Sequence, residues 1–228
     1  MTRLSSKWLV GLSLLLAFCA APAFAQTATP KLLQIYRDAL KPGVEQDYGR
    51  IEADAAKLCV TMHCPNPYLA IATIDDPKEV WFLNGFESEQ RAAQVQAAYQ
   101  ANSALTSALG DITTRKTPLL TGPAQSNLAS WLPVLSGGPP WSMAEFHYLV
   151  ITHTRGQPGA MGAVYAADDG SLFEIRPAAT LEEAKAKFAT GDPSARIFEI
   201  RPDWTVPDQA WVAADPKTWG QRTTAASH

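Results

Sequence analysis

The sequence of 228 residues lacks most of the motifs that identify a reaction directly. It contains no G-x-S-x-G, H-E-x-x-H, P-loop or G-x-G-x-x-G pattern, so the commonest hydrolases, zinc proteases and nucleotide-binding proteins lose their usual support. Metal ligands are scarce as well, with three cysteines and four histidines in the whole chain. We therefore expect neither a metal nor a cofactor.

Basic clusters and long apolar runs are also missing beyond the N-terminus. The formal net charge is −3, which argues against nucleic acid and anionic lipid as partners. The apolar run at residues 8–20 follows Arg3 and Lys7 and precedes an A-x-A site at residues 23–25, which is typical of a secretory signal. This run is shorter than the roughly 20 residues of a spanning helix. We expect cleavage after Ala25 and a soluble periplasmic or secreted product, with no membrane contact after cleavage.

Two cysteines, Cys59 and Cys64, remain after cleavage. In an oxidising compartment their proximity favours a local disulfide. His63 lies between them, but a metal site would need further ligands that no nearby cluster supplies. The spacing also differs from the C-x-x-C-H pattern of covalent haem attachment. A disulfide is the favoured interpretation, and a metal or redox role is the alternative.

The first half of the mature chain alternates between strand-like and helix-like patterns. Leu33 and Ile35 fall on one face of a first strand, while a helical period of three to four residues follows the Lys-Pro-Gly turn. The order is β-α-β-β-α-β, the ferredoxin-like motif. The expected elements are strand 32–40, helix 44–58, strands 68–74 and 80–86, a helix from Ser88 to near Gly110, and strand 112–121.

The second half repeats this layout in a shorter form. A strand at 146–154 leads to a hairpin turn at Asp169-Gly170, a helix capped at Thr180 and a last strand at 196–202. Little sequence separates the first strand from the hairpin, so the first helix of the repeat is expected to be missing or reduced. The predicted organisation is signal peptide 1–25, first unit 26–121, connector 122–144, second unit 145–202 and a tryptophan-rich tail 203–228.

This layout resembles the dimeric α/β-barrel superfamily, which includes antibiotic-biosynthesis-monooxygenase-like and NIPSNAP-like domains. The resemblance implies an α+β fold in which two ferredoxin-like sheets face each other and enclose a small-molecule cavity. A tandem copy implies a monomer with an internal pseudo-dimer, although a homodimer stays open. Haem-degrading members use a histidine on the helix after the third strand, and this sequence has none there. Trp81 on the third strand is therefore interpreted as core or cavity wall.

Two copies of the sequence FEIRP, at 173–177 and 198–202, place Phe and Ile on one strand face and Glu and Arg on the other. One interpretation is a pair of half-buried strands with solvated charges. The other is a polar interior face whose charged side chains contact a ligand or a facing sheet; these are Glu174, Arg176, Glu199 and Arg201.

The remaining candidate site residues lie on the first strand of each half. His147 and His153 are six residues apart on one strand face, about 20 Å at 3.3 Å per residue, so they cannot act as a pair. Either one can serve alone as a general base, or both can be ordinary strand histidines. Tyr36 and Arg37 lie where the resemblance places the cavity, with ordinary strand-end polarity as the alternative.

Three functions are compatible with these patterns. The first is an exported barrel that binds a small apolar or aromatic ligand. The second is a cofactor-independent oxidase, monooxygenase or isomerase with His147 or His153 as base and Tyr36, Arg37 and Trp81 around the pocket. The third is an interaction module whose tryptophan-rich tail docks a partner.

Overall fold

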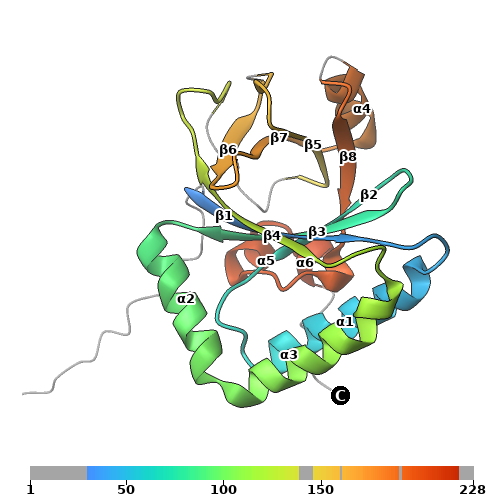
Figure 1. Ribbon diagram of the computed structural model, residues 1–228, viewed down its shortest axis with the longest axis vertical. Helices are drawn as coiled ribbons and strands as arrows, with labels where there is room; N and C mark the ends of the chain where they lie inside the picture. The colour runs from blue at the N-terminus through green and yellow to red at the C-terminus, as the bar shows by residue number, and fades with distance from the viewer. Residues whose placement is uncertain (1–29, 139–145, 160, 190–191, 221–228) are drawn as a thin grey trace, which may run out of the picture.

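The computed structural model describes residues 30–138, 146–159, 161–189 and 192–220 (Figure 1). The predicted signal peptide and cleavage site lie outside these residues. In chain order the main elements are β1 (Leu32–Ala39), α1 (Glu45–Thr61), β2 (Leu69–Thr73), β3 (Glu79–Phe86), α2 (Glu89–Ala101), α3 (Ser103–Lys116), β4 (Gln125–Trp131), β5 (Tyr148–Thr154), β6 (Ala163–Ala167), β7 (Leu172–Ala178), α4 (Leu181–Ala189), β8 (Ala195–Ile200), α5 (Gln209–Ala214) and α6 (Pro216–Trp219).

The eight strands form one closed antiparallel barrel in the order β1-β3-β2-β8-β5-β7-β6-β4. The first half contributes the run β4-β1-β3-β2 and the second half the equivalent run β8-β5-β7-β6. The pairs β2–β8 and β4–β6 join the two runs at both seams. This is the predicted α+β architecture, with two ferredoxin-like units facing each other within one chain.

The period-2 pattern of the strands decides what fills the barrel. Alternate residues of each strand point inward, and those in the middle of the barrel are apolar, starting with Leu33 and Ile35 on β1. These side chains form one buried cluster that occupies the space between the two sheets. Its strand members are Leu33, Ile35, Leu69, Ile71, Trp81, Leu83, Ala129, Leu149, Ile151, Ala163, Tyr165, Ala167, Phe173, Ile175, Phe198 and Ile200.

The two halves differ in how helices cover them (Figure 1). Helices α1, α2 and α3 lie together on one side of the molecule, and α1 packs on α3 through Ile51, Ala55 and Ile112. The second half carries α4, which packs on the outer face of β5 and β8 through Ala184. Among the described residues between β5 and β6 there is no helix. The expectation that the repeat has lost its first helix is confirmed.

The position of the fourth strand was predicted wrongly. Residues 112–116 of the strand expected at 112–121 belong instead to helix α3, which starts at Ser103. Asn102 ends α2 and caps this new helix by accepting a hydrogen bond from the Leu105 amide (3.1 Å). The strand is β4, inside the segment expected to be a connector. Its outward residues Ser126, Leu128 and Ser130 are exposed, so β4 shows no apolar run that the sequence pattern could reveal.

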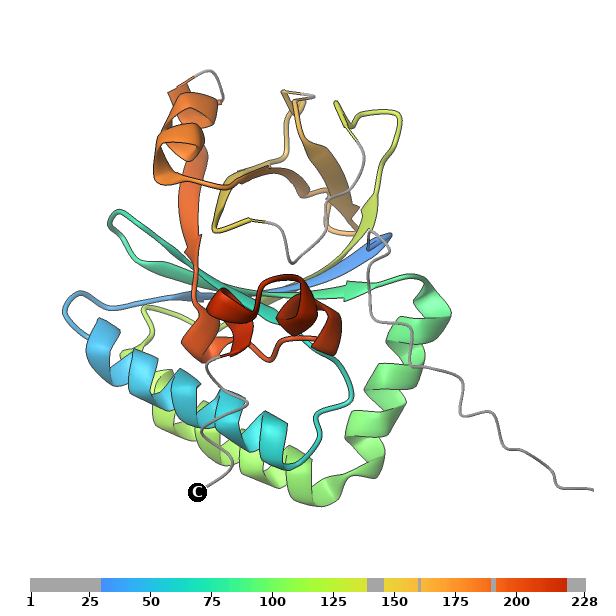
Figure 2. The ribbon, with the colours of Figure 1, turned by 180° about the vertical axis from the view of Figure 1, so that it is seen from behind.

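The C-terminal tail packs against the barrel instead of presenting its tryptophans. Figures 1 and 2 show α5 and α6 beside the strands, on the side of the three long helices. Trp204, Trp211 and Trp219 are all buried, and the last two join the interior cluster. The tail therefore offers no exposed tryptophan patch, and the docking role that required one is not supported.

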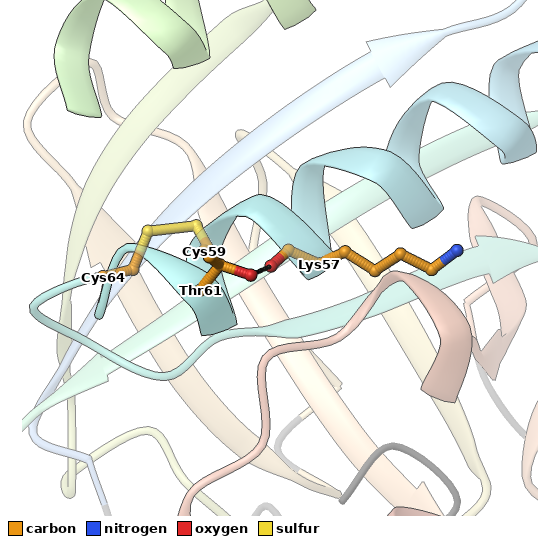
Figure 3. Close-up of a disulfide and its surroundings, with 4 residues drawn as sticks. All are labelled: Lys57, Cys59, Thr61 and Cys64. Carbon is orange, nitrogen blue, oxygen red and sulfur yellow. Dashed lines mark hydrogen bonds between the residues drawn. A yellow bond between two sulfur atoms is a disulfide. The ribbon is translucent and has the colours of Figure 1, made fainter. Parts of the chain in front are cut away.

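Cys59 and Cys64 form the predicted disulfide at the end of α1 (Figure 3). The Thr61 hydroxyl donates to the Lys57 carbonyl (2.9 Å) in the same helical turn. Cys59 is buried against Ala56 and Val206, so the bridge also anchors the loop that follows α1. Among the described helices, none is long and apolar enough to cross a membrane.

Candidate functional site

Three of the predicted site residues come together at one end of the barrel. Arg37 of β1, Trp81 of β3 and His153 of β5 all point inward there. The Arg37 Nη1 lies 2.9 Å from His153 Nδ1, and the Arg37 Cζ lies 5.5 Å from the centre of the Trp81 ring. We call these three residues, together with the side chains that contact them, the Arg37 cluster.

The other predicted residues lie elsewhere. His147 is exposed at the opposite end of β5, and Tyr36 is exposed on the outer face of β1. Arg176 is buried on the outer face of β7, where its Nη1 donates to the carbonyl of Lys187 in α4 (2.6 Å). Arg201 stacks on Trp204 with its Cζ 4.0 Å from the ring centre. The two histidines, His147 and His153, therefore do not share a site, and neither do Arg176 and Arg201.

The expected facing of the FEIRP copies is confirmed, while the expected solvation of their charges is wrong for the first copy only, since Glu199 of the second copy is exposed. Phe173, Ile175, Phe198 and Ile200 point into the barrel as expected. In the first copy, the charged residues are neither solvated nor inside the barrel. Glu174 is buried on the outer face because its carboxylate accepts hydrogen bonds from the amides of Gly159 and Met161 (2.7 and 2.8 Å) in the loop before β6. The polar interior face is therefore ruled out for these strands.

The strand register explains why Arg37 meets His153. Arg37 follows Leu33 and Ile35 as the third inward residue of β1, and His153 follows Leu149 and Ile151 as the third inward residue of β5. Each also has an aromatic partner directly across on the neighbouring strand, which is Trp81 for Arg37 and Phe173 for His153. The sequence signal for this equivalence is the pair of patterns L-x-I-x-R on β1 and L-x-I-x-H on β5.

Aromatic rings form the floor of the Arg37 cluster. The His153 ring stacks on Phe173 with centroids 4.7 Å apart, and Trp81 packs against Phe173 and Phe198 at 5.9 and 4.8 Å. The Arg37 guanidinium lies 5.5 Å from both the Trp81 and the Phe173 ring centres, a distance at which the ring faces attract a cation.

A polar chain fixes the guanidinium from the other side. Arg37 Nη2 donates to Asn127 Oδ1 (3.0 Å), and Asn127 Nδ2 donates to Asp169 Oδ2 (3.1 Å). Asp169 in turn accepts from the Ser171 amide (2.9 Å). Asn127 of β4 and Asp169 of the β6–β7 turn therefore orient Arg37. The sequence analysis did not predict either residue at the site.

A second polar group adjoins the cluster through Trp81. The Trp81 Nε1 donates to Glu79 Oε2 (2.9 Å), and Arg196 Nη1 donates to Glu79 Oε1 (2.9 Å). Arg196 also pairs with Asp75 (3.2 Å). By register, Arg196 on β8 is the counterpart of Asn127 on β4, since they lie opposite Ile151 and Ile35 respectively.

The electrostatic environment keeps His153 neutral at pH 7. Partial burial, followed by the positive charges of Arg37 and Arg155, lowers the pKa of His153 below its ordinary 6.5, against the opposing effect of Asp169 and Glu79. Burial also lowers the pKa of Arg37, but a guanidinium stays protonated. Neutral His153 can thus accept the hydrogen bond from the guanidinium.

The space around the cluster is largely occupied. The barrel interior beneath it is filled by the apolar side chains named above. An open groove of about 650 Å³ lies elsewhere, between α1 and α3, and is lined by residues such as Asp54, Lys57 and Arg115. Among the described residues there is no group of three or more His, Cys, Asp or Glu that could hold a metal ion. At the Arg37 cluster a titratable side chain, a cationic side chain and aromatic rings converge.

Comparisons with known proteins leave the family open. No family model and no curated protein matches the chain. A solved structure from Fusobacterium nucleatum, provisionally named a monooxygenase, is 12% identical and covers 80% of this chain and 94% of its own, with a TM-score of 0.44. A similarly named protein from Lactobacillus acidophilus is 11% identical, covering 79% and 98% with a TM-score of 0.42. A chlorite dismutase variant from Candidatus Nitrospira defluvii is 9% identical, covering 78% and 93% with a TM-score of 0.40. At these values the likenesses carry no argument about activity, and the fold rests on the strand pairing of this chain.

Proposed function

We propose that this protein is an exported barrel that binds a small molecule at the Arg37 cluster. The observation that carries the proposal is the half-buried guanidinium of Arg37, which the fold orients with Asn127 and sets against two aromatic rings. Keeping a charged group partly out of water costs free energy. An apolar residue at the same position would stabilise the fold without this desolvation cost. A half-buried charge that is held in this way at one end of the barrel favours binding.

A second candidate function is cofactor-independent catalysis on the bound molecule. The observation that favours it is the contact between neutral His153 and charged Arg37 at 2.9 Å. A neutral imidazole has one lone pair, so His153 can take a proton from a carbon acid once a bound substrate draws the guanidinium away from that lone pair. The guanidinium then stabilises the negative charge that develops on the substrate. This is the oxidase, monooxygenase or isomerase alternative.

Native mass spectrometry of protein purified from the periplasm of its own host tests binding. We expect a mass increment from a retained small molecule, which His153→Ala or Arg37→Met reduces and the distant Arg201→Met leaves in place. An increment that survives in Arg37→Met would contradict the proposed site. N-terminal sequencing of the same sample tests export, because cleavage after Ala25 leaves Gln26 as the first residue.

Catalysis needs a separate readout. In a screen of carbon-acid substrates, His153→Ala should lose any turnover that the native protein shows, and His147→Ala should keep it. The two histidines occupy opposite ends of the same strand, so they form a matched pair. Equal rates in native protein and His153→Ala would remove the proposed base.

A further inference from the structure

We infer that the molecule bound at the Arg37 cluster carries a carboxylate, which binds the guanidinium of Arg37. This inference rests on the proposed function and specifies the ligand class for the same site. It follows from how the charges and hydrogen-bond donors of the cluster are used.

The first argument is the difference between two arginines at the same barrel end. Arg196 contacts two carboxylates, Glu79 at 2.9 Å and Asp75 at 3.2 Å. Arg37 contacts the neutral groups of His153 and Asn127, and it forms no ion pair with any residue in the described part of the chain. The charge of Arg196 is thus neutralised by direct contact, whereas the charge of Arg37 is not.

The second argument is the count of donors. A guanidinium has five N–H groups, and the contacts to His153 and Asn127 use two of them. The Arg37 Nε is buried and has no hydrogen-bond partner within the described ranges. A buried donor without an acceptor is unfavourable, and an incoming oxygen that accepts its hydrogen bond would remove that penalty. A carboxylate matches the planar fork of the guanidinium with two oxygens.

The third argument is that the nearby carboxylates are already engaged. Asp169 accepts hydrogen bonds from Asn127 and from the Ser171 amide. Glu79 accepts from Trp81 and Arg196. Both stabilise the charge of Arg37 through space, but neither contacts it directly. The direct position on the guanidinium is left for an acid from outside the chain.

Benzoate and benzyl alcohol are suitable probes because they share a planar ring and differ in the charged group. Each is titrated into ¹⁵N-labelled native protein at pH 7.5 while the Nε–H resonance of Arg37 and the backbone amides of β1 and β5 are followed. We expect benzoate to shift these resonances with saturation and benzyl alcohol to shift them at least 10-fold more weakly. Arg37→Met should lose benzoate binding by 10-fold or more, Arg37→Lys should lose less, and Arg201→Met should bind as the native protein does.

The outcomes separate this inference from the proposed function. Equal binding of both probes at the cluster, unaffected in Arg37→Met, would overturn the carboxylate inference and leave the site intact. If neither probe moves resonances at this barrel end even at tens of millimolar, the inference and the proposed site both fall. The Arg37 resonance of the native protein gives the answer without any variant, so a folding defect in Arg37→Met does not block the test.

Discussion

Arg37 and His153 occupy equivalent positions in the two halves of the barrel and contact each other across its end at 2.9 Å. Each is the third inward residue of the first strand in its unit, and each faces an aromatic residue on the third strand. Equivalent positions of the two units thus carry different chemistry, a permanent cation in one half and a titratable imidazole in the other. That difference makes several properties of the molecule testable.

The first prediction concerns the pH dependence of stability. Because the folded state lowers the pKa of His153, it binds fewer protons than the unfolded chain between that lowered pKa and 6.5. Stability should therefore be complete above pH 6.5 and fall as the pH drops through the pKa of the folded state. Denaturant unfolding from pH 8 to pH 5 should show a smaller loss in His153→Gln than in the native protein. His147→Gln removes an exposed histidine at the other end of β5 and serves as the control; a native-like loss in both variants would refute the assignment to His153.

The second prediction concerns a buried ionic group beneath the helices. Lys116 of α3 donates to Asp38 and Glu52 (2.8 and 3.1 Å), and both carboxylates are almost fully buried. Lys116→Met leaves two buried acids without their cation, so it should lower the free energy of unfolding by about 3–5 kcal/mol. The neighbouring Arg115→Met breaks an exposed pair with Asp54 and should cost at most about 1 kcal/mol.

Urea unfolding at neutral pH measures the free energy of unfolding of the two variants, Lys116→Met and Arg115→Met. Burial, more than any other factor, raises the pKa of Glu52, and Lys116 opposes that effect. Removing Lys116 should raise this pKa further, so the penalty in Lys116→Met should shrink as the pH is lowered and Glu52 takes up a proton. Similar losses in the two variants would show that the buried group contributes no more than a surface pair.

The third prediction uses the same substitution at two helical glycines with opposite results. A Cβ at Gly49 in α1 would come within 2.9 Å of the Trp204 ring, whereas a Cβ at Gly110 in α3 would meet no atom within 4 Å. Gly49→Ala should destabilise the protein by about 1–3 kcal/mol through overpacking. Gly110→Ala should stabilise it by up to about 1 kcal/mol, because alanine favours the helix. Thermal unfolding of the two variants in one buffer checks the signs, and a shared sign would contradict the packing of α1 on Trp204.

The fourth prediction concerns the disulfide. The bridge closes a short loop with a sequence separation of 5, and the chain-entropy relation gives a stabilisation of about 2 kcal/mol for such a loop. The double substitution of Cys59 and Cys64 by alanine should lower the free energy of unfolding by about that amount. Adding a reductant to the native protein should have a similar effect and should leave the double variant unchanged. A reductant effect that persists in the double variant would point to another cause.

Much of the architecture could be predicted from the sequence because apolar residues recur at every second position along several of its strands. The residues of β1, β3, β5 and β7 carry apolar side chains on every second position, and these strands, with the hairpin at Asp169-Gly170, lie close to their predicted ranges. The fourth strand could not be found this way. Its outer face is exposed and its inner face carries Asn127, so β4 has neither an apolar run nor a regular alternation.

The candidate site was harder to predict because it depends on strand register, that is, on which residues of neighbouring strands lie opposite each other. Arg37, Trp81 and His153 were all proposed, yet nothing in the pattern showed that the two halves pair to bring Arg37 against His153. Asn127 and Arg196 lie on the strands at the two barrel seams, and their roles depend on which strands close the barrel. The position of Arg201 has a local cause that the strand pattern does not show, since its guanidinium stacks on Trp204 three residues later.

The closure of the barrel within a single chain has a consequence for how such a site can evolve. In a barrel built from two identical chains, any residue at the centre of one end faces its own copy, and an arginine at position 37 would confront a second arginine. Joining the two units in one gene removes that constraint. Each half can then change alone, which allows an acid–base group and a fixed charge, or a tryptophan and a phenylalanine, to stand opposite each other at the same barrel end.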